Sequence, residues 1–121
     1  MVNYLFDTYA LIEIIKNNPN YVRFMEESIA TTRFNLVELL YIVMAEKGEA
    51  KAREVFSKFK DAEIEVPDDI LVKAMKFRLD NKKKNLSYVD CIGYMTALEN
   101  KIRFLTGDSA FKDMPNVEFA K

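Results

Sequence analysis

The chain has 121 residues, with 18 lysine and arginine side chains against 19 aspartate and glutamate side chains and a formal net charge of −1. Half of the residues are hydrophobic, which indicates one globular domain over residues 1–121 rather than a disordered chain. The near-neutral charge excludes a global attraction to nucleic acid, the single cysteine excludes an internal disulfide, and the absence of histidine excludes His-dependent catalytic triads and His-containing zinc sites.

The first half of the chain predicts short strands that alternate with helices. A buried strand is indicated by the short apolar run "VNYLF", and a helix start by Asn18 as a cap with Pro19 at the first helical position. The predicted elements are a strand at 2–6, helices at 8–18 and 18–28, a strand at 29–34, and helices at 35–48 and 49–61.

The second half continues this alternation. The predicted elements are a strand at 62–66, helices at 68–84 and 87–101, a strand at 102–107 and a weak final strand at 117–119. Short apolar strands between helices are typical of a parallel sheet that is covered on both faces. We therefore expect a three-layer α/β/α fold with a central, mostly parallel sheet of about five strands.

The apolar segments of the sequence are too short for a membrane span. The first of them, at 2–6, stops at Asp7, so no basic and apolar leader is expected, and long runs such as 39–45 are far below the roughly 18 residues that a span needs. We expect a cytoplasmic protein that does not associate with membranes.

Four acidic residues are predicted to meet at one edge of the sheet. Asp7 follows the first strand and Asp108 follows the strand at 102–107, while Glu38 and Asp90 lie in the first turns of two helices. The carboxyl ends of parallel strands and the N-termini of the connecting helices share one edge, where α/β folds form their sites. The four carboxylates are therefore candidates for a shared site.

Each of these acids also has a structural interpretation. Asp7 is a possible N-cap, the segments "NLVE" (35–38) and "SYVD" (87–90) match capping boxes, and Asp108 in "TGDS" is a possible turn residue. The apolar sequence around two of the acids favours a site, because capping alone does not require buried, neighbouring carboxylates. Such groups repel one another unless a cation lies between them, and a site with oxygen ligands alone suits Mg²⁺ or Mn²⁺. This chemistry indicates metal-dependent hydrolysis of phosphodiesters.

Three segments of the chain together resemble the PIN-domain ribonucleases, especially the small VapC-type toxins of toxin–antitoxin pairs. The segments are "YLFDTYALIE", "TTRFNLVELLY" and "LSYVDCIGYMTALENKIRFLTGDSAF", and the resemblance covers nearly the whole chain. It implies an endoribonuclease that depends on Mg²⁺ or Mn²⁺, forms a homodimer and is inhibited by a cognate antitoxin.

The resemblance also implies roles for particular residues. The catalytic, metal-binding set falls on Asp7, Glu38, Asp90 and Asp108, and the supporting polar positions fall on Thr8, Asn35 and Thr106. One departure from the family pattern is Ala110, at a position where many relatives carry a further acid.

Basic residues near the candidate site have two interpretations. Lys82, Lys83 and Lys84 either form a solvated helix end or contact the phosphate backbone of RNA. Arg33 either contacts RNA in the same way or pairs with an acid.

Two tyrosines and the cysteine lie next to candidate site acids in the sequence. Tyr9 and Tyr88 either pack in the core or stack on a base, and Cys91 is expected to be a buried structural thiol.

Two other functions remain open on the sequence alone. One is a PIN-like module that binds RNA or a protein without cutting, which the presence of all four acids disfavours. The other is a phosphoacceptor receiver domain, which would need adjacent acids after the first strand, whereas Asp7 is followed by Thr8.

Overall fold

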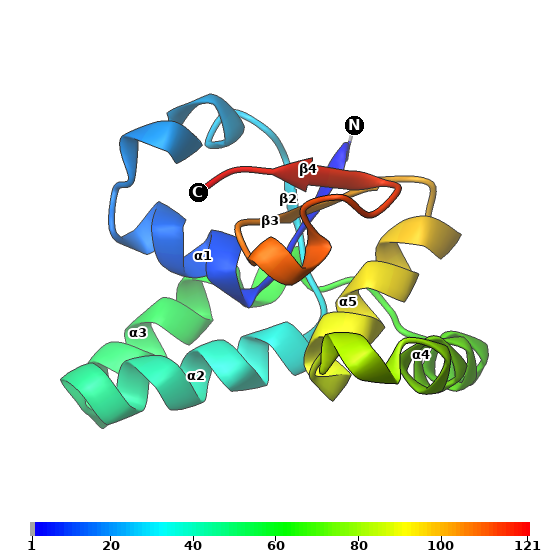
Figure 1. The fold of residues 1–121 in the computed structure, drawn as a ribbon. Coiled ribbons are helices and arrows are strands. Elements are labelled where there is room, and N and C mark those ends of the chain that lie inside the picture. Colours follow the sequence, from blue (N-terminus) through cyan, green and yellow to red (C-terminus); the bar gives the residue numbers. More distant parts are fainter. Residues whose placement is uncertain (1) are drawn as a thin grey trace.

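The structure, a computed structural model, describes residues 2–121 and contains one parallel sheet between two layers of helices (Figure 1). The strands are β1 (Tyr4–Phe6), β2 (Ile29–Ala30), β3 (Arg103–Thr106) and β4 (Val117–Phe119), in the order β2-β1-β3-β4. The α-helices are α1 (Thr8–Ile15), α2 (Arg33–Lys47), α3 (Glu49–Phe59), α4 (Asp68–Asp80) and α5 (Tyr88–Glu99). The 3₁₀ helices are η1 (Pro19–Phe24), η2 (Lys60–Ala62), η3 (Lys82–Lys84) and η4 (Ser109–Phe111). All strand pairs are parallel, so the predicted α/β/α class is confirmed.

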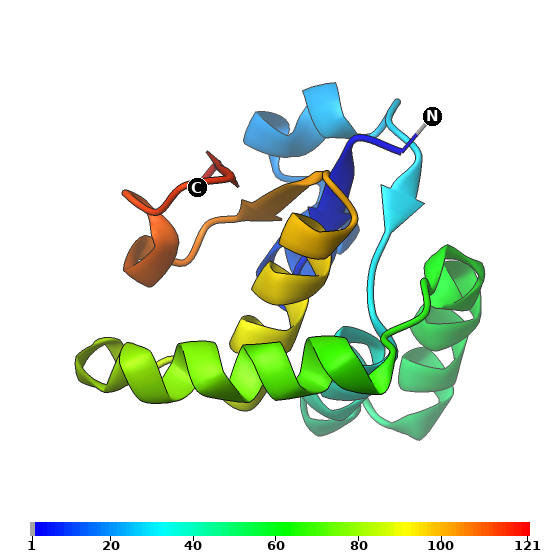
Figure 2. The same ribbon diagram turned by 90° about the vertical axis from the view of Figure 1, so that its right-hand side faces the viewer.

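Alternation of side chains along the central strands creates two hydrophobic cores. Phe6 and Leu105 contribute to the core with α1, α2, α3 and η1, whereas Leu5 and Phe104 contribute to the core with α4 and α5. Neighbouring side chains of a strand point to opposite faces, so a strand buried on both faces is apolar throughout. Figure 2 shows α4 lying across the N-terminal end of α5 on the second face. None of the helices within residues 2–121 has the length and apolar character of a membrane span.

The predicted strand at 62–66 is wrong, and the sheet within residues 2–121 has four strands rather than about five. This segment makes only an isolated parallel bridge between Thr31 and Glu63. The backbone amide of Thr31 donates to the carbonyl of Ala62 at 3.0 Å, and its carbonyl accepts from the amide of Ile64 at 2.9 Å. The neighbouring strand β2 ends at Ala30, because the chain turns into α2, and this leaves no partner for a longer strand.

Helix α2 begins earlier than the sequence pattern predicted. Its N-cap is Thr32, not Asn35, so the predicted strand at 29–34 is shortened and the predicted capping box at 35–38 is wrong. The Thr32 hydroxyl accepts from the Asn35 amide at 3.1 Å and donates to the Asn35 side-chain oxygen at 2.6 Å. A buried threonine thus supplies the cap that the sequence pattern placed three residues later.

Five of the six predicted helices are shorter than expected. The segment at 18–28 is the 3₁₀ helix η1, although the Asn18 cap and Pro19 are found as predicted. The first helix ends before Asn17, whose φ of 58° is left-handed. The helix predicted at 68–84 divides into α4 and η3, and Asn85, with a φ of 51°, ends the turn. Asparagine tolerates this left-handed conformation better than most residues do, which makes it a helix terminator.

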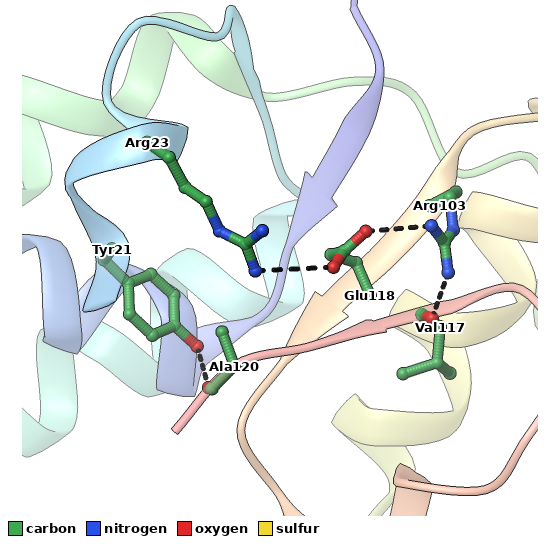
Figure 3. A network of polar contacts seen from close by, with 6 residues as sticks. All are labelled: Tyr21, Arg23, Arg103, Val117, Glu118 and Ala120. Atoms are coloured by element: carbon green, nitrogen blue, oxygen red, sulfur yellow. Dashed lines mark hydrogen bonds and ion pairs between the residues drawn. The ribbon is translucent and has the colours of Figure 1, made fainter.

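The last strand is held by polar contacts from segments distant in the sequence (Figure 3). Glu118 accepts from Arg103 at 2.8 Å and forms an ion pair with Arg23 at 3.5 Å. The Tyr21 hydroxyl, which is buried, donates to the carbonyl of Ala120 at 2.7 Å. These contacts fix the C-terminal residues beside the carboxyl edge of the sheet.

The assignment of the α2 cap predicts a stability change. Thr32→Ala should lower the free energy of unfolding by about 1–2 kcal/mol, because it removes the cap and one partner of the buried Asn35 side chain. Thr32→Ser keeps the hydroxyl and should lose less. Urea denaturation followed by circular dichroism measures both variants. Equal losses in the two variants would show that the methyl group, and not the cap, carries the effect.

Candidate active site

The strand order produces a crevice between β1 and β3. The connection from β1 leads to β2 on one side, whereas β3 lies on the other side of β1, and ligands of open α/β sheets bind at such a switch point. Residues from this edge line one open pocket of about 400 Å³. The four predicted acids are all among its lining residues: Asp7, Glu38, Asp90 and Asp108.

Asp7 is the most deeply buried of the four acids. Only 3% of it is exposed, and it caps α1 by accepting from the amide of Ala10 at 2.8 Å. Burial raises the pKa of Asp7 from its ordinary value of 3.8 to about 7, and the charges of Asp90 and Asp108 act in the same direction. Hydrogen bonds from Thr106 and from Ala10 oppose this rise in pKa. Asp7 is therefore both a helix cap and a carboxylate under electrostatic strain.

Asp90 and Asp108 also combine capping with a position at the pocket. Asp90 accepts from the Ser87 amide at 3.2 Å, and its own amide donates to the Ser87 hydroxyl at 3.0 Å, which is the predicted capping box. Burial raises the pKa of Asp90, the Ser87 bonds lower it, and the charges of Asp108 and Glu38 raise it. Asp108 accepts from the amide of Ala110 at 3.0 Å at the start of η4. The capping and site interpretations are compatible for both residues.

Glu38 has no capping role. Since α2 begins at Arg33, Glu38 lies in the second turn of that helix. Its half-buried side chain faces the pocket, and within residues 2–121 its carboxylate has no hydrogen-bond or ion-pair partner. Capping therefore does not explain its position.

The three predicted supporting residues lie around Asp7 and Asp108. Asn35 donates to the Thr8 hydroxyl at 3.1 Å, which connects the first turn of α2 to the first turn of α1. The Thr106 hydroxyl accepts from the Asp108 amide at 3.0 Å. Thr8 lines the pocket, whereas Asn35 and Thr106 are buried behind it. Their hydrogen bonds hold the segments that carry the acids.

Tyr9, Gly107 and Lys121 also line the pocket. The sequence analysis had placed Tyr9 next to a site acid, but it had not singled out Gly107 or Lys121. A Cβ atom on Gly107 would lie 2.1 Å from a ring carbon of Tyr9 and 2.5 Å from the carbonyl oxygen of Ala120, so only glycine fits there. The sequence did contain an indication of this position, because "TGD" holds one of the chain's three glycines directly before a candidate site acid. Lys121, with its Nζ 5.9 Å from the centroid of the Tyr9 ring, comes from the end of the chain and had no signal.

The predicted RNA contacts do not line the pocket. Arg33 pairs with Glu63, with N–O distances of 2.9 and 3.1 Å, which favours its ion-pair interpretation. Lys82, Lys83 and Lys84 are exposed in η3, and within residues 2–121 none of them forms an ion pair.

The donor atoms of the pocket suit a hard divalent cation. They are carboxylate and hydroxyl oxygens, and none of the four acids pairs with a lysine or arginine within residues 2–121. In the described part of the chain, no three acidic, histidine or cysteine side chains lie close enough together to hold a metal ion as they stand. Carboxylates that repel one another stay apart without a cation between them. The donor atoms thus fit a divalent cation by their chemistry, although the described residues do not form a ready binding group.

Several solved structures share this fold. A toxin–antitoxin complex from Klebsiella pneumoniae is 22% identical, with 96% of each chain covered and a TM-score of 0.73. VapBC2 from Rickettsia felis, bound to a DNA fragment of its promoter, is 20% identical over 100% of each chain, with a TM-score of 0.76. VapC20 from Mycobacterium tuberculosis, a toxin that cleaves the sarcin–ricin loop, is 14% identical, with 98% of this chain and 100% of that chain covered and a TM-score of 0.83.

A comparison with curated protein sequences found no match. The family model of the PIN domain matches residues 4–117, a range that contains all four acids of the pocket. The chain therefore belongs to the PIN domain family.

Proposed function

We propose that the protein is a ribonuclease that hydrolyses RNA phosphodiester bonds at the pocket of Asp7, Glu38, Asp90 and Asp108, with Mg²⁺ or Mn²⁺ as its cofactor. The observation that carries this proposal is that four carboxylates from four separate segments line one pocket at the sheet edge, with one of them buried. Family membership and the fold shared with an RNA-cleaving toxin support it.

The chain's own residues would hold the cation and orient the substrate. The four carboxylates would bind Mg²⁺ or Mn²⁺, and such an ion neutralises charge on the phosphate and lowers the pKa of water. The Ala10 amide and Thr106 fix the Asp7 carboxylate, and the Asp108 amide is fixed by the same threonine. This holds two of the carboxylates at the ends of neighbouring strands. In this proposal the protein provides no nucleophile of its own.

We also propose protein partners, namely a cognate antitoxin and a second copy of the chain. The neighbours include toxin–antitoxin complexes, which supports the first partner. Helix α2 exposes apolar side chains at spacings of three and four residues along one face, which supports a protein contact there. These residues are Phe34, Val37, Tyr41 and Met44.

The site assignment predicts loss of cleavage in two variants. Asp7→Asn and Asp90→Asn should each lower the rate of Mg²⁺- or Mn²⁺-dependent RNA cleavage by about 100-fold or more, because a ligand charge is lost while the cap geometry is kept. Gel assays on a mixed RNA pool measure the rate. Asp113→Asn, an exposed acid outside the pocket, is the matched control and should cleave normally. Undiminished cleavage by either site variant would contradict the assignment.

The raised pKa of Asp7 predicts a pH-dependent stability. An acid whose pKa is higher in the folded state than in the unfolded state contributes fully to the stability of the fold below pH 4. This contribution is lost as the pH rises through about 7. Asparagine stays neutral and accepts the same Ala10 hydrogen bond. In a chelating buffer, Asp7→Asn should therefore melt about 4 °C or more above the wild type at pH 8, with little difference at pH 4. A variant that melts lower at both pH values would identify Asp7 chiefly as a charged cap.

Addition of the cation should reverse this order. At pH 8, millimolar Mg²⁺ or Mn²⁺ should raise the melting temperature of the wild type and raise that of Asp7→Asn much less, because only the native wild-type site retains the full charge for binding. Thermal melts with K⁺ at equal ionic strength separate specific binding from screening. Equal shifts in both proteins would place the cation elsewhere.

A further inference from the structure

Within residues 2–121, Lys121 is the one basic side chain that lines the acidic pocket. The side chain is exposed, and it forms no ion pair with an acid of this part of the chain. The basic residues that the sequence pattern offered as RNA contacts lie outside the pocket. Lys121 is therefore a positive charge at the pocket that remains available to a ligand.

Hydrogen bonds hold the backbone around Lys121 at the edge of the sheet. The Ala120 amide donates to the Thr106 carbonyl at 3.0 Å, and the Ala120 carbonyl accepts from the Tyr21 hydroxyl at 2.7 Å (Figure 3). The Asn20 side chain donates to the Lys121 carbonyl at 2.8 Å. On residues 120 and 121 these bonds use main-chain atoms alone. The Lys121 side chain can therefore be replaced without loss of the contacts that place it.

Gly107 allows this segment to lie close to Tyr9. A Cβ atom on Gly107 would lie 2.5 Å from the Ala120 carbonyl oxygen and 2.1 Å from a ring carbon of Tyr9, so both neighbours occupy the space that the glycine leaves. The Lys121 Nζ lies 5.9 Å from the centroid of the Tyr9 ring, a distance at which a cation is still attracted to an aromatic face. The ring and the fixed backbone thus keep the ammonium group beside the pocket.

Lys121 stands between two open pockets of the surface. Besides the acidic pocket, it lines a neighbouring pocket of about 550 Å³. Apart from Ala120, the other lining residues of this second pocket come from η1, and Arg23 is among them. A strand that extends from the acids toward the second pocket would therefore pass Lys121.

We propose that Lys121 binds the phosphate group next to the cleaved bond of the RNA, at the boundary between the two pockets. The inference rests on the proposed function and adds a substrate-binding residue to the four acids. Four carboxylates carry more negative charge than one divalent cation neutralises, so they repel a polyanionic strand that approaches the metal site. A lysine at the boundary offsets this repulsion, because it supplies a point charge and three N–H donors for phosphate oxygens.

Two other roles of this side chain agree less well with the structure. An internal counter-ion of the acids would form an ion pair with one of them, and within residues 2–121 no ion pair involves Lys121. A purely structural side chain would be packed in the core, whereas Lys121 is exposed and is anchored through its main chain. A contact with a ligand accounts for both observations.

The first test measures RNA binding without cleavage, in the Asp90→Asn background with Mg²⁺, by the fluorescence anisotropy of a short labelled RNA. Addition of Lys121→Gln should raise the Kd about fivefold and reduce the slope of log K against log salt by about 0.7, as expected for the loss of one phosphate contact. Lys121→Arg keeps the charge and should bind as the background variant does. An unchanged Kd and slope in the glutamine variant, or no binding by the background variant, would overturn the inference.

Lys112 provides the matched control for this titration. It is also exposed, its Nζ lies 5.8 Å from the centroid of the Phe119 ring, and it lines neither of the two pockets. Lys112→Gln removes the same charge and should leave the Kd and the slope unchanged. Equal losses in the two glutamine variants would reveal a general effect of net charge and would overturn the assignment to Lys121.

A second test locates the contact on the RNA. It uses a series of RNAs, each with one neutral methylphosphonate in place of a phosphate, in the same Asp90→Asn background. The replacement next to the cleaved bond should raise the Kd about fivefold when Lys121 is present and have little further effect with Lys121→Gln, because that charge pair is already lost. Equal losses in the two proteins at every position of the series would overturn the contact.

Kinetics separate this inference from the proposed function. With Mn²⁺ and otherwise wild-type protein, Lys121→Gln should raise KM about fivefold and leave kcat unchanged, because the neighbouring phosphate carries the same charge in the substrate and in the transition state. Weaker binding by the glutamine variant without any cleavage by the wild type would overturn the proposed function and keep the role of Lys121. Cleavage by the wild type with an unchanged Kd and KM in Lys121→Gln would do the reverse.

Discussion

The carboxylate of Asp7, buried at the crevice between β1 and β3, is the constraint on which the site depends. Burial and two neighbouring acids raise its pKa to about 7, so its ionised form is costly without a compensating cation. The protein retains this costly group in a position where the Ala10 amide and Thr106 fix it. Such an arrangement has a physical purpose if a divalent ion supplies the missing charge.

Capping and site formation are parts of one arrangement in this fold. The carboxylates of Asp7, Asp90 and Asp108 each accept a hydrogen bond from a backbone amide at the start of a helix, and all three line the same pocket. A parallel sheet brings helix N-termini to the edge where its strands end, so a capping carboxylate at that edge is also available to a ligand. Glu38 is the exception, since it lies beyond the first turn and has no cap to make. Its position is therefore the strongest single argument against capping as the whole explanation.

Three surfaces around the pocket differ in chemistry. The pocket itself presents carboxylates, the surface of η3 and the start of α5 presents cations and one tyrosine, and one face of α2 presents apolar side chains. Carboxylates suit a metal site, and an exposed apolar face suits a protein contact.

Composition, periodicity and residue order alone determined the fold class and the set of acids, because apolar strands and amphipathic helices follow from local hydrophobic pattern. The glycine of "TGD" could also be noticed in the sequence, but the lack of space for a side chain at Gly107 could not. Tertiary structure decided the rest. The bridge at Thr31 was too short for a fifth strand, Thr32 displaced Asn35 as the cap, and Arg33 paired with Glu63. Each of these outcomes depends on a partner distant in the sequence or on competition between adjacent caps. The local pattern contains neither.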